Sequence, residues 1–215
     1  MGDESLPADT GKAKFVGGGS PFADVSKVCL LLRDMPSAWH VCGGWAIDLF
    51  LGRVTRAHKD VDISVARADQ LRAHEFMRAR GWTLEKAAGG RLEPWGEGEL
   101  LPARVHGVWC RNEAHDPPFV ELLFDEADAR EFRFRRDPSV TLPLERASFE
   151  TEVSETGVRA RVLAPELVLL YKSKGAGANE EDFRNARRAL GAGARAWLKG
   201  ALGKVYGRHP WADFL

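Results

Sequence analysis

The chain has 215 residues, of which 44% are hydrophobic, and 31 basic side chains balance 31 acidic ones to give a formal net charge of zero. This length suits one domain, or a domain with a helical appendage. Zero net charge argues against non-specific binding along nucleic acid, which requires a positive excess to neutralise phosphates. Three scattered cysteines are too few for a disulfide framework or a zinc site. Because no apolar run approaches the roughly 18–20 residues that cross a membrane, and the N-terminus lacks a signal-peptide pattern, we expect a cytoplasmic protein with no membrane partner.

The N-terminal segment is predicted to be a flexible tail followed by a helix. Residues 1–19 are polar and end in three consecutive glycines, which favours flexibility. Ser20 is a suitable N-cap, and Pro21 suits the first position of a helix. An amphipathic helix to about Asp34 is predicted from apolar residues at helical spacing, namely Phe22, Val25, Val28, Cys29 and Leu32.

A double-glycine turn joins a short strand to the next helix. Gly43 and Gly44 follow a predicted strand over residues 39–42, and an apolar helix-like run continues to Gly52, the usual C′ residue. Because glycine has no Cβ atom, the backbone N–H groups at this turn can approach a phosphate closely. The start of the helix offers further unpaired N–H donors and a favourable dipole. The turn is therefore predicted to bind phosphate.

The strand that follows carries two carboxylates on one face. Asp60 and Asp62 alternate with three apolar residues, Val61, Ile63 and Val65, so strand geometry sends the carboxylates to one side and the apolar groups to the other. Residues two apart on a strand lie roughly 6.5–7 Å apart, a span over which two carboxylates can share one or two hard divalent cations. Without a cation, two close acids repel and one tends to stay protonated. The pair therefore indicates Mg²⁺.

Further elements follow in a mixed order and end in helices. A central strand buried on both faces is predicted over residues 119–124, where Glu121 is the single acid in an apolar run. Because a buried acid is costly unless it is paired or bound to a metal, Glu121 is the candidate third carboxylate. The other predictions are a helix over 69–80, a strand over 82–86, a loop or hairpin over 87–99, a strand over 105–109, short strands and turns over 132–162, and helices over 165–174, 179–190 and 197–205.

An ordered string of residues runs through the turn, the helix, the basic loop and the aspartate strand: Gly43-Gly44-Trp45-Ala46-Ile47-Asp48, Gly52-Arg53, Thr55-Arg56, His58, Asp60 and Asp62. This string resembles the nucleotidyltransferase (polymerase β-like) superfamily, and more narrowly its branch of aminoglycoside and lincosamide nucleotidyltransferases. The resemblance implies an α+β fold, with a small mixed β-sheet flanked by helices and followed by a helical C-terminal part. We accordingly divide the chain into a tail (1–19), a nucleotidyltransferase-like domain (20–163) and a helical domain (164–215).

The resemblance also implies a reaction and its site. Enzymes of this branch transfer a nucleoside monophosphate from an NTP to a drug hydroxyl, with two Mg²⁺ ions held by the aspartate pair and a third acid. Here those residues are Asp60, Asp62 and Glu121, and Glu121 acts either as a metal ligand or as the base. A lysine on a C-terminal helix contacts the triphosphate, and either Lys172 or Lys174 matches it. Lys174 is favoured because it continues the apolar stripe of the predicted helix.

The basic loop and the second C-terminal helix each allow two interpretations. Arg53, Arg56 and His58 are either phosphate contacts, with Arg56 and His58 favoured by their closeness to Asp60, or a solvated loop. Trp45 and Asp48 are predicted to be structural. Asn179 is predicted to cap its helix with help from Asp182. The acidic run at 180–182 is then either charge at the positive end of the helix dipole or an acidic wall for a cationic drug.

Several acceptors are compatible with this pattern. The expected acceptor is a hydroxyl of a small molecule, such as an aminoglycoside or lincosamide antibiotic. A protein hydroxyl would make the chain an AMP-transferring or antitoxin-like regulator, and a nucleic-acid 3′ end is disfavoured by the zero net charge. An NTP-binding module without turnover is the non-enzymatic alternative, against which the intact aspartate pair and glycine turn argue.

Overall fold

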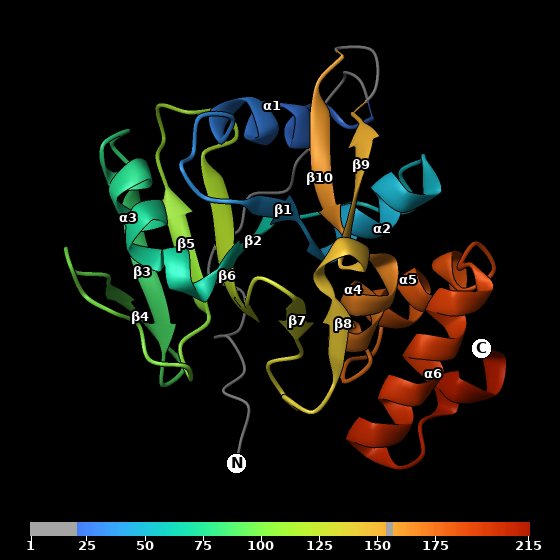
Figure 1. The fold of residues 1–215 in the computed structure, drawn as a ribbon. Helices are drawn as coiled ribbons and strands as arrows, with labels where there is room; N and C mark the ends of the chain where they lie inside the picture. The colour runs from blue at the N-terminus through green and yellow to red at the C-terminus, as the bar shows by residue number, and fades with distance from the viewer. Residues whose placement is uncertain (1–20, 154–156) are drawn as a thin grey trace.

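The computed structural model describes residues 21–153 and 157–215. Figure 1 shows a mixed sheet with helices around it and a group of C-terminal helices at one side. The helices are α1 (Ala23–Leu31), α2 (Gly43–Leu51), α3 (Gln70–Arg78), α4 (Pro165–Lys172), α5 (Ala178–Ala186) and α6 (Ala192–Tyr206). The strands are β1 (Trp39–Val41), β2 (Asp62–Ala66), β3 (Thr83–Ala88), β4 (Arg91–Pro94), β5 (Gly107–Arg111), β6 (Phe119–Ala127), β7 (Glu131–Arg133), β8 (Thr141–Pro143), β9 (Ser148–Glu152) and β10 (Arg159–Leu163).

The predicted central strand is confirmed as β6. The main strand order is β4-β3-β5-β6-β2-β1-β10-β9, with β7 and β8 attached at the end of β6. β6 is antiparallel to β5 and parallel to β2. In the second pairing Asp62 lies opposite Glu121, so the sheet register itself brings the two predicted carboxylates together. This register is fixed by apolar burial, because a slip of one residue would turn every side chain of the strand to the other face.

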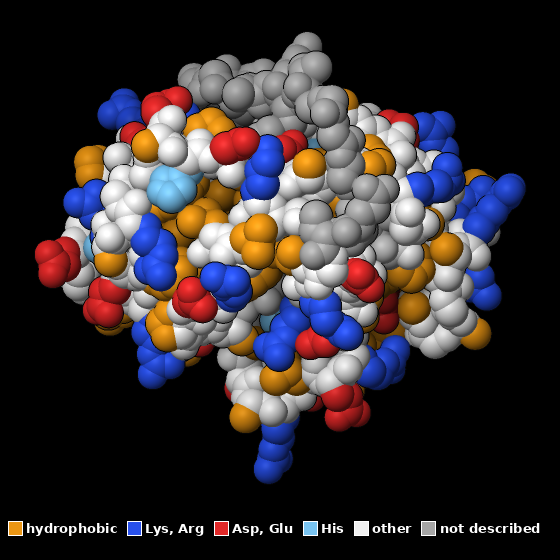
Figure 2. Space-filling view, turned by 90° about the horizontal axis from the view of Figure 1, so that it is seen from above, with side chains coloured by type: hydrophobic (Ala, Val, Ile, Leu, Met, Phe, Trp, Pro, Cys, Tyr) orange, Lys and Arg blue, Asp and Glu red, His pale blue; other side chains and the backbone are white. Residues whose placement is uncertain are grey.

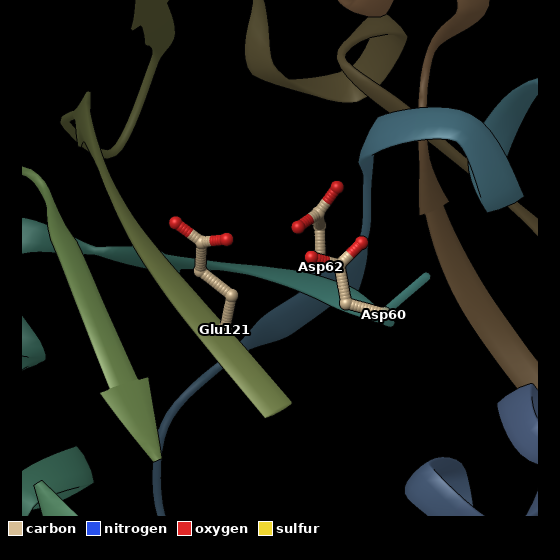
Figure 3. Close-up of side chains that lie close together, drawn as sticks. All are labelled: Asp60, Asp62 and Glu121. Carbon is tan, nitrogen blue, oxygen red and sulfur yellow. The ribbon is translucent and has the colours of Figure 1, made fainter. Parts of the chain in front are cut away.

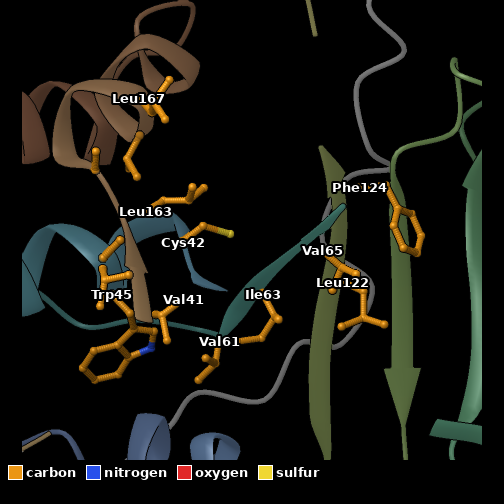
Figure 4. Packing of buried hydrophobic residues seen from close by; sticks show 14 of the residues in the cluster. Val41, Cys42, Trp45, Val61, Ile63, Val65, Leu122, Phe124, Leu163 and Leu167 are labelled. Atoms are coloured by element: carbon orange, nitrogen blue, oxygen red, sulfur yellow. The ribbon is translucent and has the colours of Figure 1, made fainter. Parts of the chain in front are cut away.

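The alternation read from the aspartate strand is also confirmed. Val61, Ile63 and Val65 are fully buried. Figure 4 shows them in one apolar cluster with residues of β1, β6 and the C-terminal helices, including Val41, Leu122 and Leu167. The predicted helix at the N-terminus likewise buries its apolar stripe, Phe22, Val25, Val28, Cys29 and Leu32.

The C-terminal helices lie against the glycine-turn helix rather than apart from the sheet. α2 contacts both α4 and α5, and α4 contacts α6. In Figure 1 this group occupies the side opposite α3 and the β3–β4 hairpin. The chain passes from β10 into α4 at Ala164, a residue buried in the core. The C-terminal helices therefore form part of the same core as the sheet. The domain boundary at 163/164 stays a prediction.

Several predicted boundaries are corrected by the structure. β2 begins at Asp62, so Asp60 precedes the strand. α4 ends at Lys172 rather than Lys174. Of the two alternatives for 87–99, the hairpin is confirmed, because β4 pairs antiparallel with β3. Asn179 does not cap α5, because Gly177 holds the N-cap position and Asn179 lies in the first turn. The tail at 1–19, the Ser20 cap and most of the turn after β9 lie outside the described residues.

On the face of the molecule seen from above, neither acidic nor basic side chains of the described residues dominate. Figure 2 shows acidic and basic side chains interspersed there among apolar and neutral groups. This agrees with the zero net charge and offers nothing like the basic stripe that tracks a nucleic-acid backbone. Over residues 21–153 and 157–215, no helix has the length and apolarity needed to span a membrane.

Candidate functional site

Three carboxylates converge where β2 and β6 run side by side. Asp62 begins β2, Asp60 lies two residues earlier, and Glu121 projects from β6 opposite Asp62. Figure 3 shows the three side chains turned into a common space above the two strands. One carboxylate oxygen of each residue lies within 4.8 Å of one oxygen of each of the others. The structure thus brings together all three acids that the sequence singled out.

The chemistry of this cluster suits a hard divalent cation. Glu121 is only 3% exposed, while Asp60 and Asp62 are half-buried. Three carboxylates at this separation repel one another unless protons or a cation neutralise them. Oxygen ligands are the ones that Mg²⁺ prefers, and Mg²⁺ sites commonly use a few carboxylates and leave positions for substrate phosphates. The donor set therefore fits the predicted metal, and it is the one cluster of this kind in the described part of the chain.

The carboxylates lie in the wall of a cavity of about 400 Å³ between the sheet and the C-terminal helices. Gly43 and Cys42 contribute from the glycine turn, and Lys172 contributes from the end of α4. Asn179 contributes from α5. Other lining residues, which the sequence interpretation missed, are His106, Leu123, Phe124, Asp125, Arg135, Arg136, Leu163, Val168 and Tyr171. A volume of this size is typical of small-molecule sites.

Both glycines of the turn make room for side chains. Gly43 has a φ of +63°, and a Cβ atom on it would overlap the Asp62 carboxylate, lying 2.8 Å from its Cγ. A Cβ atom on Gly44 would overlap the Arg56 guanidinium and lie 2.6 Å from Nδ1 of His58. The sequence interpretation gave these glycines one task, close approach of a phosphate. The structure adds a second, because the missing Cβ atoms let Asp62 and the basic loop pack against the turn.

His58 is part of a buried structural group behind the turn. Its Nε2 lies 2.6 Å from Oδ2 of Asp48, and the Thr55 hydroxyl donates to Oδ1 of Asp48 at 2.5 Å. The imidazole stacks on Trp45 with ring centroids 4.2 Å apart. His58 is 7% exposed and does not line the cavity. This agrees with the structural role predicted for Trp45 and Asp48, and His58 belongs to the same buried group. Contact between His58 and a phosphate stays a prediction.

Asp48→Ala is expected to lower the free energy of unfolding by about 3 kcal/mol. The substitution removes a fully buried carboxylate and leaves the Thr55 hydroxyl and the His58 imidazole without their hydrogen-bond partner. Urea denaturation measures the change. Asp34→Ala serves as the control, since the side chain of Asp34 is 72% exposed and such a substitution usually changes stability by less than about 0.5 kcal/mol. Equal stability of the two variants would contradict the structural assignment.

The other basic residues of the loop have different positions. Arg53 is exposed and lies outside the cavity lining. Arg56 turns towards α5, where its Nε and Nη2 donate to the two carboxylate oxygens of Asp182 at 2.8 and 3.0 Å. Nζ of Lys172 lies 2.8 Å from the same carboxylate. Of the acidic run at 180–182, Glu180 and Glu181 lie in the first turn of α5, as expected for charge at the helix dipole. Asp182 differs, because its side chain is fully buried between two cations.

The ionisation of this group follows from its contacts. Burial of Asp182 opposes its charged form, but the hydrogen bond from Arg56 and the nearby Lys172 charge hold the pKa of this carboxyl below its usual value. Burial likewise opposes the charge on Arg56, yet the hydrogen bond and charge of Asp182 raise the pKa of the guanidinium. Lys172 lines the cavity, whereas Lys174 is exposed and lies beyond the end of α4. The geometry thus favours Lys172 over Lys174.

A fourth acid of the cavity, Asp125, lies further along β6 than Glu121. Burial raises its pKa, although hydrogen bonds from the Ser64 hydroxyl and the Tyr171 phenol act against this shift. The phenol donates at 2.9 Å, and its own pKa is raised by burial and by the Asp125 charge. Strand alternation could have found Asp125, because it lies four residues after Glu121 and thus on the same face. Arg135 and Arg136 follow β7 in a segment with no recognisable motif.

Comparison with known proteins bears on this geometry. The sequence model of the Aminoglycoside-2''-adenylyltransferase family matches residues 24–91, which include the glycine turn and the aspartate pair. A 2''-aminoglycoside nucleotidyltransferase of Escherichia coli and one of Klebsiella pneumoniae are each 38% identical over 86 residues. The match covers 39% of this chain and 45% of each relative, so the chain aligns with somewhat less than half of these curated proteins.

Solved structures match over most of the chain. The solution structure of the antibiotic-resistance factor ANT(2'')-Ia superimposes with a TM-score of 0.58 and 17% identity, covering 86% of this chain and 92% of that one. The chain has the nucleotidyltransferase fold. The lincosamide antibiotic adenylyltransferase LnuA, solved with lincomycin bound, matches with a TM-score of 0.54 and 15% identity, over 78% of this chain and 97% of that one. ANT(2'')-Ia has also been solved with adenylyl-2''-tobramycin. The predicted resemblance is therefore confirmed in sequence for the aminoglycoside nucleotidyltransferases and in fold for LnuA.

Proposed function

We propose that this chain is a Mg²⁺-dependent nucleotidyltransferase that moves a nucleoside monophosphate from an NTP to a hydroxyl of a small molecule. The observation that carries the proposal is the convergence of Asp60, Asp62 and Glu121 in the wall of a cavity that a lysine also lines. Carboxylates that hold divalent cations beside a phosphate-binding cation are the parts that phosphoryl transfer needs, since it depends mainly on positioning and charge neutralisation.

Different residues of the cavity would bind the phosphates of the NTP and the metal ions. Gly43 and the N–H groups at the start of α2 face the phosphates, and the Lys172 ammonium supplies a positive charge on the same side of the fold. Bound Mg²⁺, two ions in this proposal, would be held by Asp60, Asp62 and Glu121 and would neutralise charge on the transferred phosphate and on the leaving pyrophosphate. We keep Arg56 and His58 out of direct phosphate contact, because both are packed behind the turn.

At the α-phosphorus, the reaction makes one P–O bond and breaks another. The acceptor oxygen forms a bond to the α-phosphorus, the bond from that phosphorus to the pyrophosphate oxygen breaks, and the acceptor hydroxyl loses its proton. Glu121 is the most buried of the three carboxylates. It serves either as the group that takes this proton or as a ligand of the metal, in which case the proton passes to solvent. For a base, geometry requires an approach of about 2.6–3.2 Å to the acceptor hydroxyl.

The acceptor is proposed to be an aminoglycoside or a lincosamide. The support is the likeness to a 2''-aminoglycoside nucleotidyltransferase in sequence and to LnuA and ANT(2'')-Ia in fold. The zero net charge also favours a small acceptor over a nucleic-acid end. A protein acceptor, or binding of an NTP without turnover, remains as an outcome that the following experiment separates.

Pyrophosphate release from ATP, GTP, CTP and UTP, measured with Mg²⁺ and a panel of aminoglycosides and lincosamides, tests the proposal. We expect release that requires one class of drug and that chelation of Mg²⁺ abolishes. The product should gain the mass of one nucleoside monophosphate. Thermal stabilisation by Mg²⁺ and an NTP, without release for any drug, would instead favour a protein acceptor or a silent binding module. Absence of both stabilisation and release would contradict a nucleotide site altogether.

A further inference from the structure

Asp182 is a carboxylate that two cations share, at a place where three separate elements meet. Arg56 comes from the segment between α2 and β2, Lys172 from the end of α4, and Asp182 from α5. The three side chains are 18%, 13% and 0% exposed, respectively. Two positive charges thus share one buried carboxylate, and the charges of Asp48 and Glu181 also act on Arg56. Because Arg56 has these further acidic neighbours and Lys172 borders the cavity, Lys172 is the cation of the group that is placed to meet an anionic ligand.

Lys172 is the member of this group that reaches the cavity. Of the three side chains, that of Lys172 lines the cavity, on which Gly43 and the metal-binding carboxylates also border. Arg56 commits its Nε and Nη2 to Asp182 and its Nη1 to the carbonyl of Ala57. It is packed against Gly44, where a Cβ atom would displace its guanidinium. The anion is therefore expected to contact Lys172, while Arg56 stays in place.

The contacts also restrict where the lysine can be. A lysine has a flexible four-carbon stem, so at the last residue of a helix it would sample many positions. Here Nζ of Lys172 lies 2.8 Å from Oδ2 of Asp182 and 3.3 Å from Oδ1 of Asn179. Both partners belong to α5, and an ammonium group has three donors. Two of them are directed to α5, which leaves the third for a ligand in the cavity.

We propose that Asp182 is a positioning residue that sets the affinity for the triphosphate by holding Lys172 at the cavity wall. Arg56 contributes by sharing the carboxylate, so that Asp182 orients the ammonium without neutralising the whole group. This inference rests on the proposed function, and it names the residues that tune its nucleotide affinity. Gly44 leaves room for Arg56, Arg56 binds Asp182, and Asp182 holds Lys172. These three residues therefore affect phosphate binding through Lys172.

The test compares Asp182→Asn, Lys172→Met, the double variant and Asp34→Asn. The last variant is the control, because it makes the same chemical change at a side chain that is 72% exposed and lies outside the cavity lining. The measurements are KM and kcat for the NTP in pyrophosphate release, and the Kd of each of ATP, GTP, CTP and UTP with Mg²⁺ in the absence of acceptor. We expect Lys172→Met and Asp182→Asn each to raise KM and Kd at least about fivefold with a smaller change in kcat. The control should match the wild type.

The double variant separates positioning from a general structural effect. Because Asp182 is proposed to act through Lys172, adding Asp182→Asn to Lys172→Met should change KM by less than about twofold. Multiplied effects would overturn the proposal, and so would a lower KM in Asp182→Asn, which would show that the carboxylate competes with the nucleotide for the lysine. If Asp182→Asn does not fold, Asp182→Glu moves the charge by one methylene, and an unchanged KM in that variant would also overturn it.

Failure of the proposed function gives a different result from failure of the positioning role. A wild-type protein that neither binds Mg²⁺ with any of the four NTPs nor releases pyrophosphate would remove the proposed function, and the positioning role with it. A wild-type protein that binds and turns over an NTP, together with an Asp182→Asn variant of unchanged KM and Kd, would remove the positioning role alone.

Discussion

Asp62→Asn is expected to reduce nucleotidyl transfer by about 10³-fold or more while the fold stays intact. Asparagine has nearly the same shape as aspartate, and Asp62 contributes to a cavity wall rather than to apolar packing, so little stability is lost. The substitution removes one of three charges whose oxygens lie within 4.8 Å of one another. Loss of metal-based charge stabilisation is worth several kcal/mol in a transition state, and about 4 kcal/mol corresponds to about 10³-fold in rate.

The same substitution has a readout that does not depend on turnover. Titration with Mg²⁺ or Mn²⁺ should show weaker metal binding in Asp62→Asn and in Asp60→Asn than in the wild type. Asp34→Asn, at an exposed position outside the cavity lining, should leave metal binding and turnover unchanged. Full turnover in both Asp60→Asn and Asp62→Asn would refute the assignment of the carboxylates. Thermal unfolding of each variant checks that the fold persists.

The parts of the site that were predictable are those fixed by strand geometry. The alternation around Asp60 and Asp62 placed both acids on the polar side of a half-buried strand, and the apolar run around Glu121 identified a strand buried on both faces. Two such strands with apolar residues on the core side have few possible registers. The observed one pairs Asp62 with Glu121. Local pattern therefore identified the three acids, and the pairing of β2 with β6 brings them together.

The unpredictable parts depend on contacts between distant segments. Asp182 lies in an acidic run that resembles ordinary helix-capping charge, and only the packing of α5 against α2 reveals that it is buried. Its partner Arg56 is 126 residues away in the chain. The choice between Lys172 and Lys174 depended on where α4 ends, and helix ends are the least reliable part of a sequence interpretation. Arg135 and Arg136 line the cavity from a segment without periodicity.

The glycine turn shows how one local motif serves both the backbone and its neighbours. Gly43 supports a left-handed backbone, with φ of +63°, and gives space to the Asp62 carboxylate. Gly52 has nearly the same φ, +66°, but nothing lies within 4 Å of a Cβ atom built on it. The two positions therefore form a matched pair, because an alanine introduces the same backbone strain at both and a steric clash at only one.

Gly43→Ala is expected to lower nucleotidyl transfer at least about 100-fold, whereas Gly52→Ala should keep nearly full activity. A left-handed alanine costs about 1–2 kcal/mol, so both variants should lose stability by about that amount in urea denaturation. In Gly43→Ala the new methyl group must also displace the Asp62 carboxylate from its place beside Glu121. A misplacement of about 1 Å in a catalytic constellation is enough to cost about 100-fold in rate. Metal titration should show weaker binding in Gly43→Ala alone. Similar losses of activity in both variants would mean that backbone strain, rather than the space reserved for Asp62, explains the glycine at position 43.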